Sequence, residues 1–136
     1  MDREEGPGFG FIAGGVGITG LLSMLRTMAD RRDARPAVLF YANGDWEGVA
    51  FREDLEQLRN QVNLTVVHVL NRPPQDWAGE AGFVTAELLA RHLPPGYQRF
   101  QFFICGPPPM MDAAERALAK LGVPDARIHT ERFDMV

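Results

Sequence analysis

Strand-like apolar runs alternate along this chain with segments whose apolar residues recur at helical spacing, and this alternation constrains the fold more than any other feature. It is typical of strand–helix–strand units, which build a parallel sheet with helices on both faces. We expect five strands, at residues 9–13, 37–42, 64–70, 100–105 and 127–133. Right-handed connections then give a three-layer α/β domain with a five-stranded parallel sheet. Ligands bind such a sheet beyond the carboxyl ends of its strands, so a site is expected in the loops after residues 13, 42 and 105.

Four helices are expected between these strands. The first is indicated by apolar residues at helical spacing, namely Ile18, Leu21, Leu22, Leu25 and Met28. The second has Phe51, Leu55 and Leu58 on one face, and the third follows Thr85, which is a suitable N-cap residue. The fourth spans residues 109–121, and residues 71–80 are expected to form a loop.

Length and charge restrict the domain organisation and the partners. A chain of 136 residues is long enough for one domain, so we expect a mobile segment at residues 1–8 followed by a single domain at residues 9–136. The net charge of −4 argues against nucleic acid as a partner. Five glycines interrupt the most apolar stretch, residues 9–25, so direct insertion of this domain into a membrane is not expected.

Cys105 is the only cysteine of the sequence. It excludes an intrachain disulfide and a zinc site built from several cysteines, and no metal site is expected. A reducing compartment, the cytoplasm, is therefore the expected location. Cys105 follows an apolar strand, where a small buried thiol is common, and no histidine lies near it in sequence to activate a nucleophile.

A glycine-rich loop separates the first expected strand from the first helix. Gly15, Gly17 and Gly20 satisfy the pattern G-x-G-x-x-G, in which the backbone turns tightly and approaches a pyrophosphate at a helix start. The same glycines would also serve a tight helix start without any ligand. The acidic residue that dehydrogenases carry at the end of the second strand is missing, because Asp45 and Glu47 come too late. The loop therefore indicates a dinucleotide cradle of another lineage.

A proline-rich loop, Cys105-Gly106-Pro107-Pro108-Pro109-Met110, follows the fourth expected strand. Prolines fix the backbone and remove N–H donors, so the loop is expected to form a rigid wall above the sheet, with a proline in the first helical turn.

These two loops and the closing Glu131-Arg132-Phe133 resemble the nucleotide-binding half of the ferredoxin-NADP reductase superfamily, over essentially the whole chain. The resemblance implies a ferredoxin reductase-like domain that positions NADH or NADPH for hydride transfer to FAD, with onward electron transfer. FAD is then held mainly by a preceding β-barrel domain, which is absent from this sequence and is expected in the same full-length chain or in a partner chain. A downstream electron acceptor is the second expected partner. The closing triplet suggests relatives among ferric reductases, NADPH oxidases and oxygenase reductases.

The resemblance also implies roles for individual residues. Cys105 would sit beside the reacting nicotinamide ring, and Glu131 would be a polar partner near Cys105 and the flavin, which makes these two the expected catalytic residues. The expected cofactor-binding residues are Gly14, Gly15, Val16, Gly17, Ile18, Thr19, Tyr41, Asn43, Cys105, Gly106, Pro107, Pro108, Met110 and Phe133.

Two positions depart from the pattern of that superfamily. Gly20 stands where proline is usual, and Gly44 stands where relatives often have arginine. Because residues 43–47 contain no Arg or Lys, NADH is slightly favoured over NADPH. Trp46 and Trp77 would either flank an adenine or cover the edge of the domain.

Two alternatives to a reductase domain remain open. One is a non-catalytic nucleotide-binding or partner-docking module with the same fold, and the other is a stand-alone dehydrogenase, which lacks its ribose-binding acid here. Upstream domains of the reductase would place it in the cytoplasm or on the cytoplasmic face of a membrane.

Overall fold

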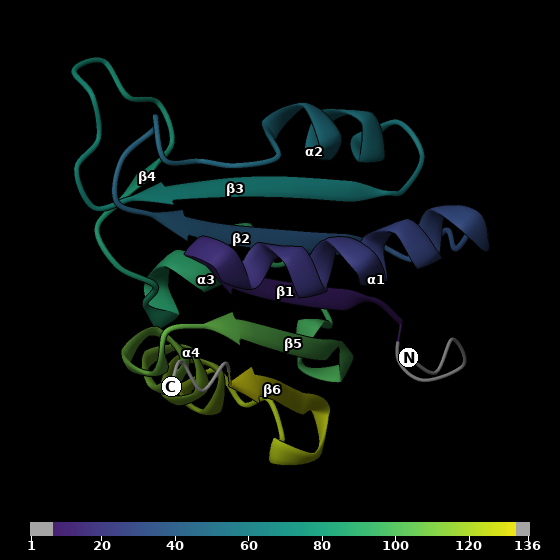
Figure 1. The fold of residues 1–136 in the computed structure, drawn as a ribbon. Helices are drawn as coiled ribbons and strands as arrows, with labels where there is room; N and C mark the ends of the chain where they lie inside the picture. Colours follow the sequence, from purple (N-terminus) through teal and green to yellow (C-terminus); the bar gives the residue numbers. More distant parts are fainter. Residues whose placement is uncertain (1–6, 133–136) are drawn as a thin grey trace.

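Six strands form one parallel sheet in the order β4-β3-β2-β1-β5-β6 (Figure 1). The structure is a computed structural model that describes residues 7–132. The strands are β1 (Phe9–Gly14), β2 (Ala37–Asn43), β3 (Leu64–Leu70), β4 (Glu80–Ala81), β5 (Gln101–Gly106) and β6 (Ile128–Arg132). The predicted parallel sheet is confirmed, but it has six strands instead of five. β4 lies in the segment expected to be a loop, and its two residues are too few to produce a periodic pattern.

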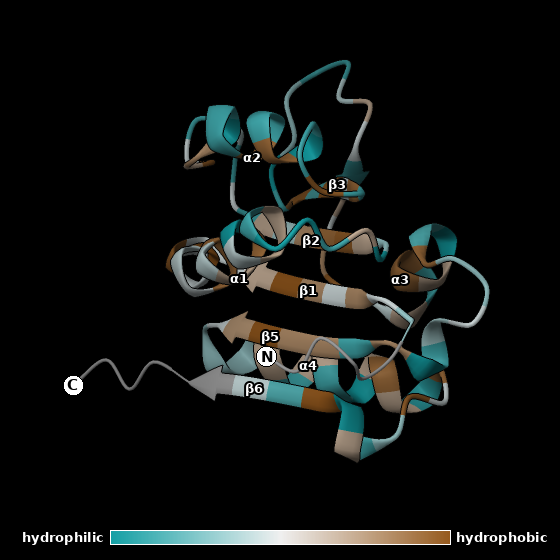
Figure 2. Cartoon of the chain, turned by 90° about the vertical axis from the view of Figure 1, so that its right-hand side faces the viewer, coloured by the Kyte–Doolittle hydropathy of each residue, from teal (hydrophilic) through white to brown (hydrophobic). Residues whose placement is uncertain are grey.

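Helices cover both faces of this sheet, which confirms the three-layer prediction (Figures 1 and 2). They are α1 (Ile18–Asp30), α2 (Arg52–Arg59), α3 (Ala86–His92) and α4 (Pro108–Lys120). The short 3-10 turns η1 (Gly15–Gly17), η2 (Tyr97–Arg99) and η3 (Asp125–Arg127) lie in connections between strands and helices. One apolar cluster lies under α1 and α2, and a second lies under α3 and α4. We refer to them as the α1-side cluster and the α4-side cluster.

The central strand β1 shows how the sequence produces these layers. Every residue of β1 is buried, as expected for a strand covered on both faces. Phe9 and Phe11 belong to the α1-side cluster, whereas Ile12 belongs to the α4-side cluster. A Cβ on Gly10 would collide with the ring of Phe102 on the neighbouring strand β5. β1 therefore lies at the centre of the hydrophobic core.

A local sequence signal marks the start of α3 but not that of α2. The side chain of Thr85 accepts a hydrogen bond from the backbone N–H of Leu88 at 3.2 Å, which confirms Thr85 as the N-cap of α3. Phe51 was expected on a buried helix face, but it precedes α2 with φ of +65° and is 39% exposed. Only Leu55 and Leu58 anchor α2 to the sheet. Of the N-terminal segment expected to be mobile, residues 1–6 lie outside the described part, and the carbonyl of Gly8 accepts from the Gln101 N–H at 3.1 Å.

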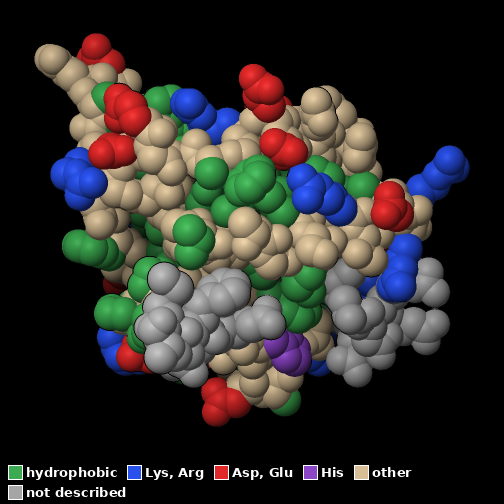
Figure 3. All heavy atoms as spheres, in the orientation of Figure 1, with side chains coloured by type: hydrophobic (Ala, Val, Ile, Leu, Met, Phe, Trp, Pro, Cys, Tyr) green, Lys and Arg blue, Asp and Glu red, His purple; other side chains and the backbone are tan. Residues whose placement is uncertain are grey.

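The surface carries no basic patch on the described part of the face that shows α1 and α2, where acidic and basic side chains are interspersed (Figure 3). None of the helices within residues 7–132 has the length and apolarity needed to cross a membrane. Among the same residues, no group of three His, Cys, Asp or Glu side chains is placed to hold a metal ion.

Candidate functional site

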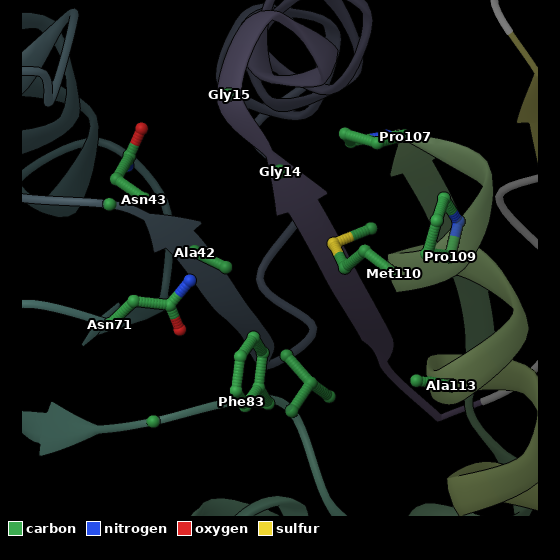
Figure 4. Close-up of a pocket in the computed structure, with 13 residues that line it drawn as sticks. Gly14, Gly15, Ala42, Asn43, Asn71, Phe83, Pro107, Pro109, Met110 and Ala113 are labelled. Carbon is green, nitrogen blue, oxygen red and sulfur yellow. The ribbon is translucent and has the colours of Figure 1, made fainter.

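An open crevice of about 440 Å³ lies at the carboxyl ends of the central strands (Figure 4). It sits where the strand order reverses, because β2 lies on one side of β1 and β5 lies on the other. This is the position at which open α/β sheets bind their ligands. One wall comes from the start of α4, with Pro107, Pro109 and Met110, and the opposite wall contains Asn71 and Phe83.

The glycine loop and the proline loop meet at the bottom of the crevice. A Cβ on Gly17 would collide with the carbonyl oxygen of Cys105, although Gly17 itself has an ordinary helical φ of −59°. A Cβ on Gly14 would lie 2.7 Å from the sulfur of Met110, and one on Gly106 would lie 2.7 Å from the Met110 methyl group. The two loops therefore touch backbone to backbone at Gly17, where only glycine fits, whereas the contacts of Gly14 and Gly106 are chiefly with the flexible end of the Met110 side chain.

Gly15 opens onto the crevice and adopts φ of +54°, a left-handed conformation that favours glycine. Space beside its Cα is free within 4 Å. The next residues turn away from the crevice, because Val16 is 71% exposed and the Thr19 hydroxyl donates to the Val16 carbonyl at 3.1 Å. Ile18 is buried in the α1-side cluster.

Apart from Glu131 and Phe133, the expected site residues separate into three groups. Those that line the crevice are Gly14, Gly15, Asn43, Pro107 and Met110. Gly17 and Gly106 support it from below through their close contacts. The others do not line it, namely Val16, Ile18, Thr19, Tyr41, Cys105 and Pro108.

Cys105 is 1% exposed and packs in the α1-side cluster, whereas the crevice is bordered by residues of the α4-side cluster such as Met110 and Ala42. The thiol thus lies on the opposite face of β5 from the crevice. In the sheet register, the backbone of Cys105 pairs with that of Glu131. The side chain of Glu131 and the whole of Phe133 lie outside the part of the chain that the structure describes.

The end of β2 contributes Asn43 to the crevice, while Tyr41 stabilises the loop that follows the strand. Asn43 lines the crevice, and its Nδ2 is buried without a hydrogen-bond partner among the described residues. The Asn43 side chain lies beside the Tyr41 hydroxyl, where it acts against the rise in the pKa of that group. Tyr41 instead holds the following loop, since its hydroxyl donates to the Ala50 carbonyl at 3.2 Å and accepts from the Ala50 N–H at 3.3 Å. Burial raises the pKa of the Tyr41 hydroxyl, which keeps it protonated.

The two tryptophans cover the edge of the domain. Their ring centroids are 5.3 Å apart, and both rings are partly buried against the α1-side cluster. Neither Trp46 nor Trp77 lines the crevice. Their placement favours the structural alternative over contact with an adenine.

Sequence reasoning missed the wall opposite α4. Phe83 lines the crevice and is 72% exposed, and Asn71, Gly82 and Val84 lie on the same side. The signal was a large apolar residue directly after Gly82, at the end of a polar loop and two residues ahead of the Thr85 cap. An exposed aromatic ring at the rim of a crevice is a common binding element.

A charged cluster fixes this wall to α3. The carboxylate of Glu80 accepts from Arg91 at 2.7 Å and lies 2.7 Å from His92 Nε2, while the Glu80 carbonyl accepts from the Trp77 indole at 2.9 Å. Hydrogen bonds from Arg91 and His92 lower the pKa of Glu80 from its ordinary value of 4.5 to about 2. The cluster holds β4 in place, and the chain enters the Gly82–Val84 segment directly from β4.

Glu80→Gln should remove one pH-dependent part of the stability. The pKa of Glu80 is lower in the folded state, so its contribution is present above pH 4.5 and is lost as the pH falls towards 2. Because the Arg91 partner is 56% exposed, we expect a contribution of about 1 kcal/mol. Urea unfolding at pH 7 and pH 3 measures it, and the difference between wild type and Glu80→Gln should shrink at pH 3. An equal difference at both pH values would contradict the assignment.

In this parallel sheet, a glycine-rich turn and a proline-rich turn meet at the point where the strand order reverses. This arrangement is typical of a dinucleotide-binding α/β domain. Residues 11–116 match the family model described as the oxidoreductase NAD-binding domain. The chain belongs to this family, and its resemblance to the ferredoxin-NADP reductase superfamily is confirmed.

Curated relatives support this assignment. The chain is 37% identical over 134 residues to NADH-cytochrome b5 reductase 1 of Aspergillus oryzae, covering 93% of this chain and 46% of the relative. It is 40% identical over 126 residues to NADH-cytochrome b5 reductase 2 of Gallus gallus, covering 90% of this chain and 41% of the relative. The chain thus spans somewhat less than half the length of these relatives. The ferric reductase placement fits more loosely than cytochrome b5 reductase.

Solved structures show the same fold. The cytochrome b5 reductase domain of Ulva prolifera nitrate reductase superposes with a TM-score of 0.83 at 25% identity, covering 94% of this chain and 49% of that one. The FAD/NAD-binding domain of a nitric oxide dioxygenase from Vibrio cholerae superposes with a TM-score of 0.84 at 26% identity, covering 98% of this chain and 53% of that one.

Proposed function

We propose that this chain binds NADH in the crevice and positions the nicotinamide for hydride transfer to FAD held by a second domain. The observation that carries this proposal is the meeting of the glycine and proline loops at the switch point of the sheet, beside an open crevice. The matches to NADH-cytochrome b5 reductases support a role within a flavin-dependent reductase.

The crevice residues suit the parts of a dinucleotide. Gly14 and Gly15 allow the backbone to approach a pyrophosphate without a side chain in the way. The ring of Phe83 offers a flat apolar surface to an adenine, and Asn43 lines the crevice at the end of β2. Met110 and the prolines before it give the opposite wall a fixed shape. The dinucleotide supplies the hydride, while the protein controls distance and alignment.

Cys105 and Glu131 are proposed to act at the nicotinamide end. The support is their pairing across β5 and β6 at the carboxyl edge of the sheet, two residues before Pro107, where the proline loop begins to line the crevice. Because the thiol is buried, Cys105 is a positioning residue that sets the backbone of Gly106 and Pro107.

Cys105→Ala should slow hydride transfer about fivefold without raising KM for NADH, since a small displacement of the loop misaligns the ring. Loss of the buried sulfur should also lower the free energy of unfolding by about 1 kcal/mol. Stopped-flow flavin reduction in the protein containing the flavin domain measures the first effect, and urea unfolding measures the second. Cys105→Ser preserves the volume and should recover most of the rate. If the rate of hydride transfer fell only in proportion to the fraction of folded protein, Cys105 would have a purely structural role in the core.

The partners follow from the same proposal. The FAD-binding domain would be in the full-length chain or in a partner chain, and the names of the relatives favour a haem protein of the cytochrome b5 type as electron acceptor. A cytoplasmic location, or one on the cytoplasmic face of a membrane, agrees with a lone buried cysteine.

Titration with NAD⁺ and NADH tests nucleotide binding directly. We expect heat by calorimetry, and amide shifts at Gly14, Gly15 and Asn43, at micromolar to millimolar nucleotide. No heat and no shifts at millimolar nucleotide would overturn the proposal. Binding without flavin reduction in the protein that contains the flavin domain would favour the alternative, a non-catalytic nucleotide-binding module.

A further inference from the structure

Phe83 is held at the crevice by a short segment with few anchors. Before it, β4 pairs with β3 through only two residues, and the Gly82 N–H donates to the Leu70 carbonyl at 2.8 Å. After it, Val84 is buried in the α4-side cluster. The ring itself is mostly exposed and lies opposite the start of α4 (Figure 4). Its position therefore depends on the backbone on either side of it and not on packing around the ring.

The charged cluster of Glu80, Arg91 and His92 joins the two ends of this segment. Arg91 donates from Nε and Nη2 to the two carboxylate oxygens of Glu80, at 3.1 and 2.7 Å. His92 Nε2 lies 2.7 Å from the same carboxylate, and the His92 ring meets the buried ring of Phe40 edge-on, with centroids 6.1 Å apart. Glu80 begins β4, whereas its two partners lie in the last turn of α3. The cluster therefore closes the segment that carries Phe83 into a loop.

The cluster is separate from the ligand site. None of its three residues lines the crevice, so any effect that they have on a nucleotide there is indirect. The Arg91 side chain is 56% exposed, and an ion pair of this kind adds little to the stability of a whole domain. Paired hydrogen bonds between a guanidinium and a carboxylate nevertheless fix an orientation. They can set the position of a segment with few other anchors, because such segments open locally at low cost.

We propose that Glu80, Arg91 and His92 are positioning residues for the Phe83 ring, and that they set the affinity for the adenine half of the dinucleotide without touching it. The inference rests on the proposed function, because it needs the adenine to lie on Phe83. With the cluster intact, the ring is in place before the nucleotide arrives. Without the cluster, the ring is in place for only part of the time, and the apparent dissociation constant rises in inverse proportion to that fraction.

A double-mutant cycle with Glu80→Gln and Phe83→Ala tests the proposal, by calorimetric titration of the whole chain with NAD⁺. Glu80→Gln alone should weaken NAD⁺ about fivefold, which corresponds to a ring in place about one-fifth of the time. In the Phe83→Ala background, Glu80→Gln should change the affinity by less than about twofold, because no ring is left to position. Arg91→Ala should repeat both results. Arg91→Lys keeps the charge but loses the paired geometry, so its affinity should fall between those of wild type and Arg91→Ala.

Steady-state kinetics of the protein containing the flavin domain provide a second readout. Glu80→Gln should raise KM for NADH about fivefold and leave the rate of flavin reduction at saturating NADH unchanged, because only the adenine end loses a contact. Cys105→Ala is expected to show the opposite pattern. A purely structural role of the cluster would instead lower the rate with the fraction of folded protein and leave KM unchanged.

Lys120 provides a matched control, because it forms another exposed ion pair of α3, with Glu87 at 3.7 Å, that does not involve β4. Lys120→Ala should leave NAD⁺ affinity unchanged. Equal weakening by Glu80→Gln in the wild-type and Phe83→Ala backgrounds would overturn the proposal, as would no weakening in either. In both cases the proposed function would stand. Failure of the wild type to bind NAD⁺ would instead overturn the proposed function, and the role of the cluster with it.

Discussion

Gly17→Ala should lower the free energy of unfolding by about 3 kcal/mol, because the added methyl group has no space. The new Cβ would overlap the carbonyl oxygen of Cys105. That oxygen belongs to the backbone of β5, which is paired with β1 at Ala13, so neither element can retreat without breaking the central sheet. Urea unfolding followed by circular dichroism measures the loss, and the melting temperature should fall by roughly 10 °C. NAD⁺ affinity should fall as well, because the two loops would be forced apart.

Gly96→Ala is the matched control for this substitution. Gly96 has φ of +85° and open space beside its Cα, so a side chain there meets backbone strain but no atom. We expect a loss of about 1 kcal/mol and unchanged NAD⁺ affinity, since Gly96 lies outside the crevice. If both alanine variants lost the same stability, the contact between the glycine loop and β5 would not be the reason for Gly17.

Phe83→Ala should weaken the binding of NAD⁺ about thirtyfold, because an aromatic ring stacked on a base contributes about 2 kcal/mol. The ring is 72% exposed in the free chain, so its removal should change the free energy of unfolding by less than about 0.5 kcal/mol. The substitution at Phe83 is therefore expected to change the affinity for NAD⁺ but not the stability of the fold. Calorimetric titration of the variant and the wild type measures the first, and urea unfolding measures the second.

Phe83→Tyr should bind within about threefold of wild type, since it keeps the flat ring. Phe51 offers a second control, because it is also exposed, at 39%, but does not line the crevice. Phe51→Ala should leave NAD⁺ affinity unchanged. Unaltered binding in Phe83→Ala would mean that the adenine lies elsewhere.

The central part of this fold was predictable because its signals are local and repeated. The apolar runs of β1, β2, β3 and β5 are long, and Thr85 occupies the cap position that its sequence context indicates. The glycine and proline loops were predictable for the same reason, since each joins a strand to a helix. Their contact follows from topology, because parallel neighbours place both loops at one edge of the sheet.

The other wall of the crevice was not predictable in this way. β4 has two residues, and it pairs with β3 only through Glu80 and Ala81, so no periodicity reveals it. Phe83 owes its position to that short strand. Arg91 reaches Glu80 from the last turn of α3, and spacing along the chain does not indicate this contact between residues 11 apart. The side of β5 on which Cys105 packs was likewise set by tertiary packing and not by the motif.

The crevice has two walls of unequal stiffness. The wall with Pro107 and Pro109 is preset by ring-constrained backbone and continues into the 13 residues of α4. The wall with Phe83 is attached to the sheet only through the two residues of β4 and to α3 through the charged cluster at Glu80. The first wall would therefore fix the orientation of a ligand, and the second wall would contact the ligand from the other side. With this arrangement, a dinucleotide could bind and dissociate repeatedly while its nicotinamide is held in the same orientation each time.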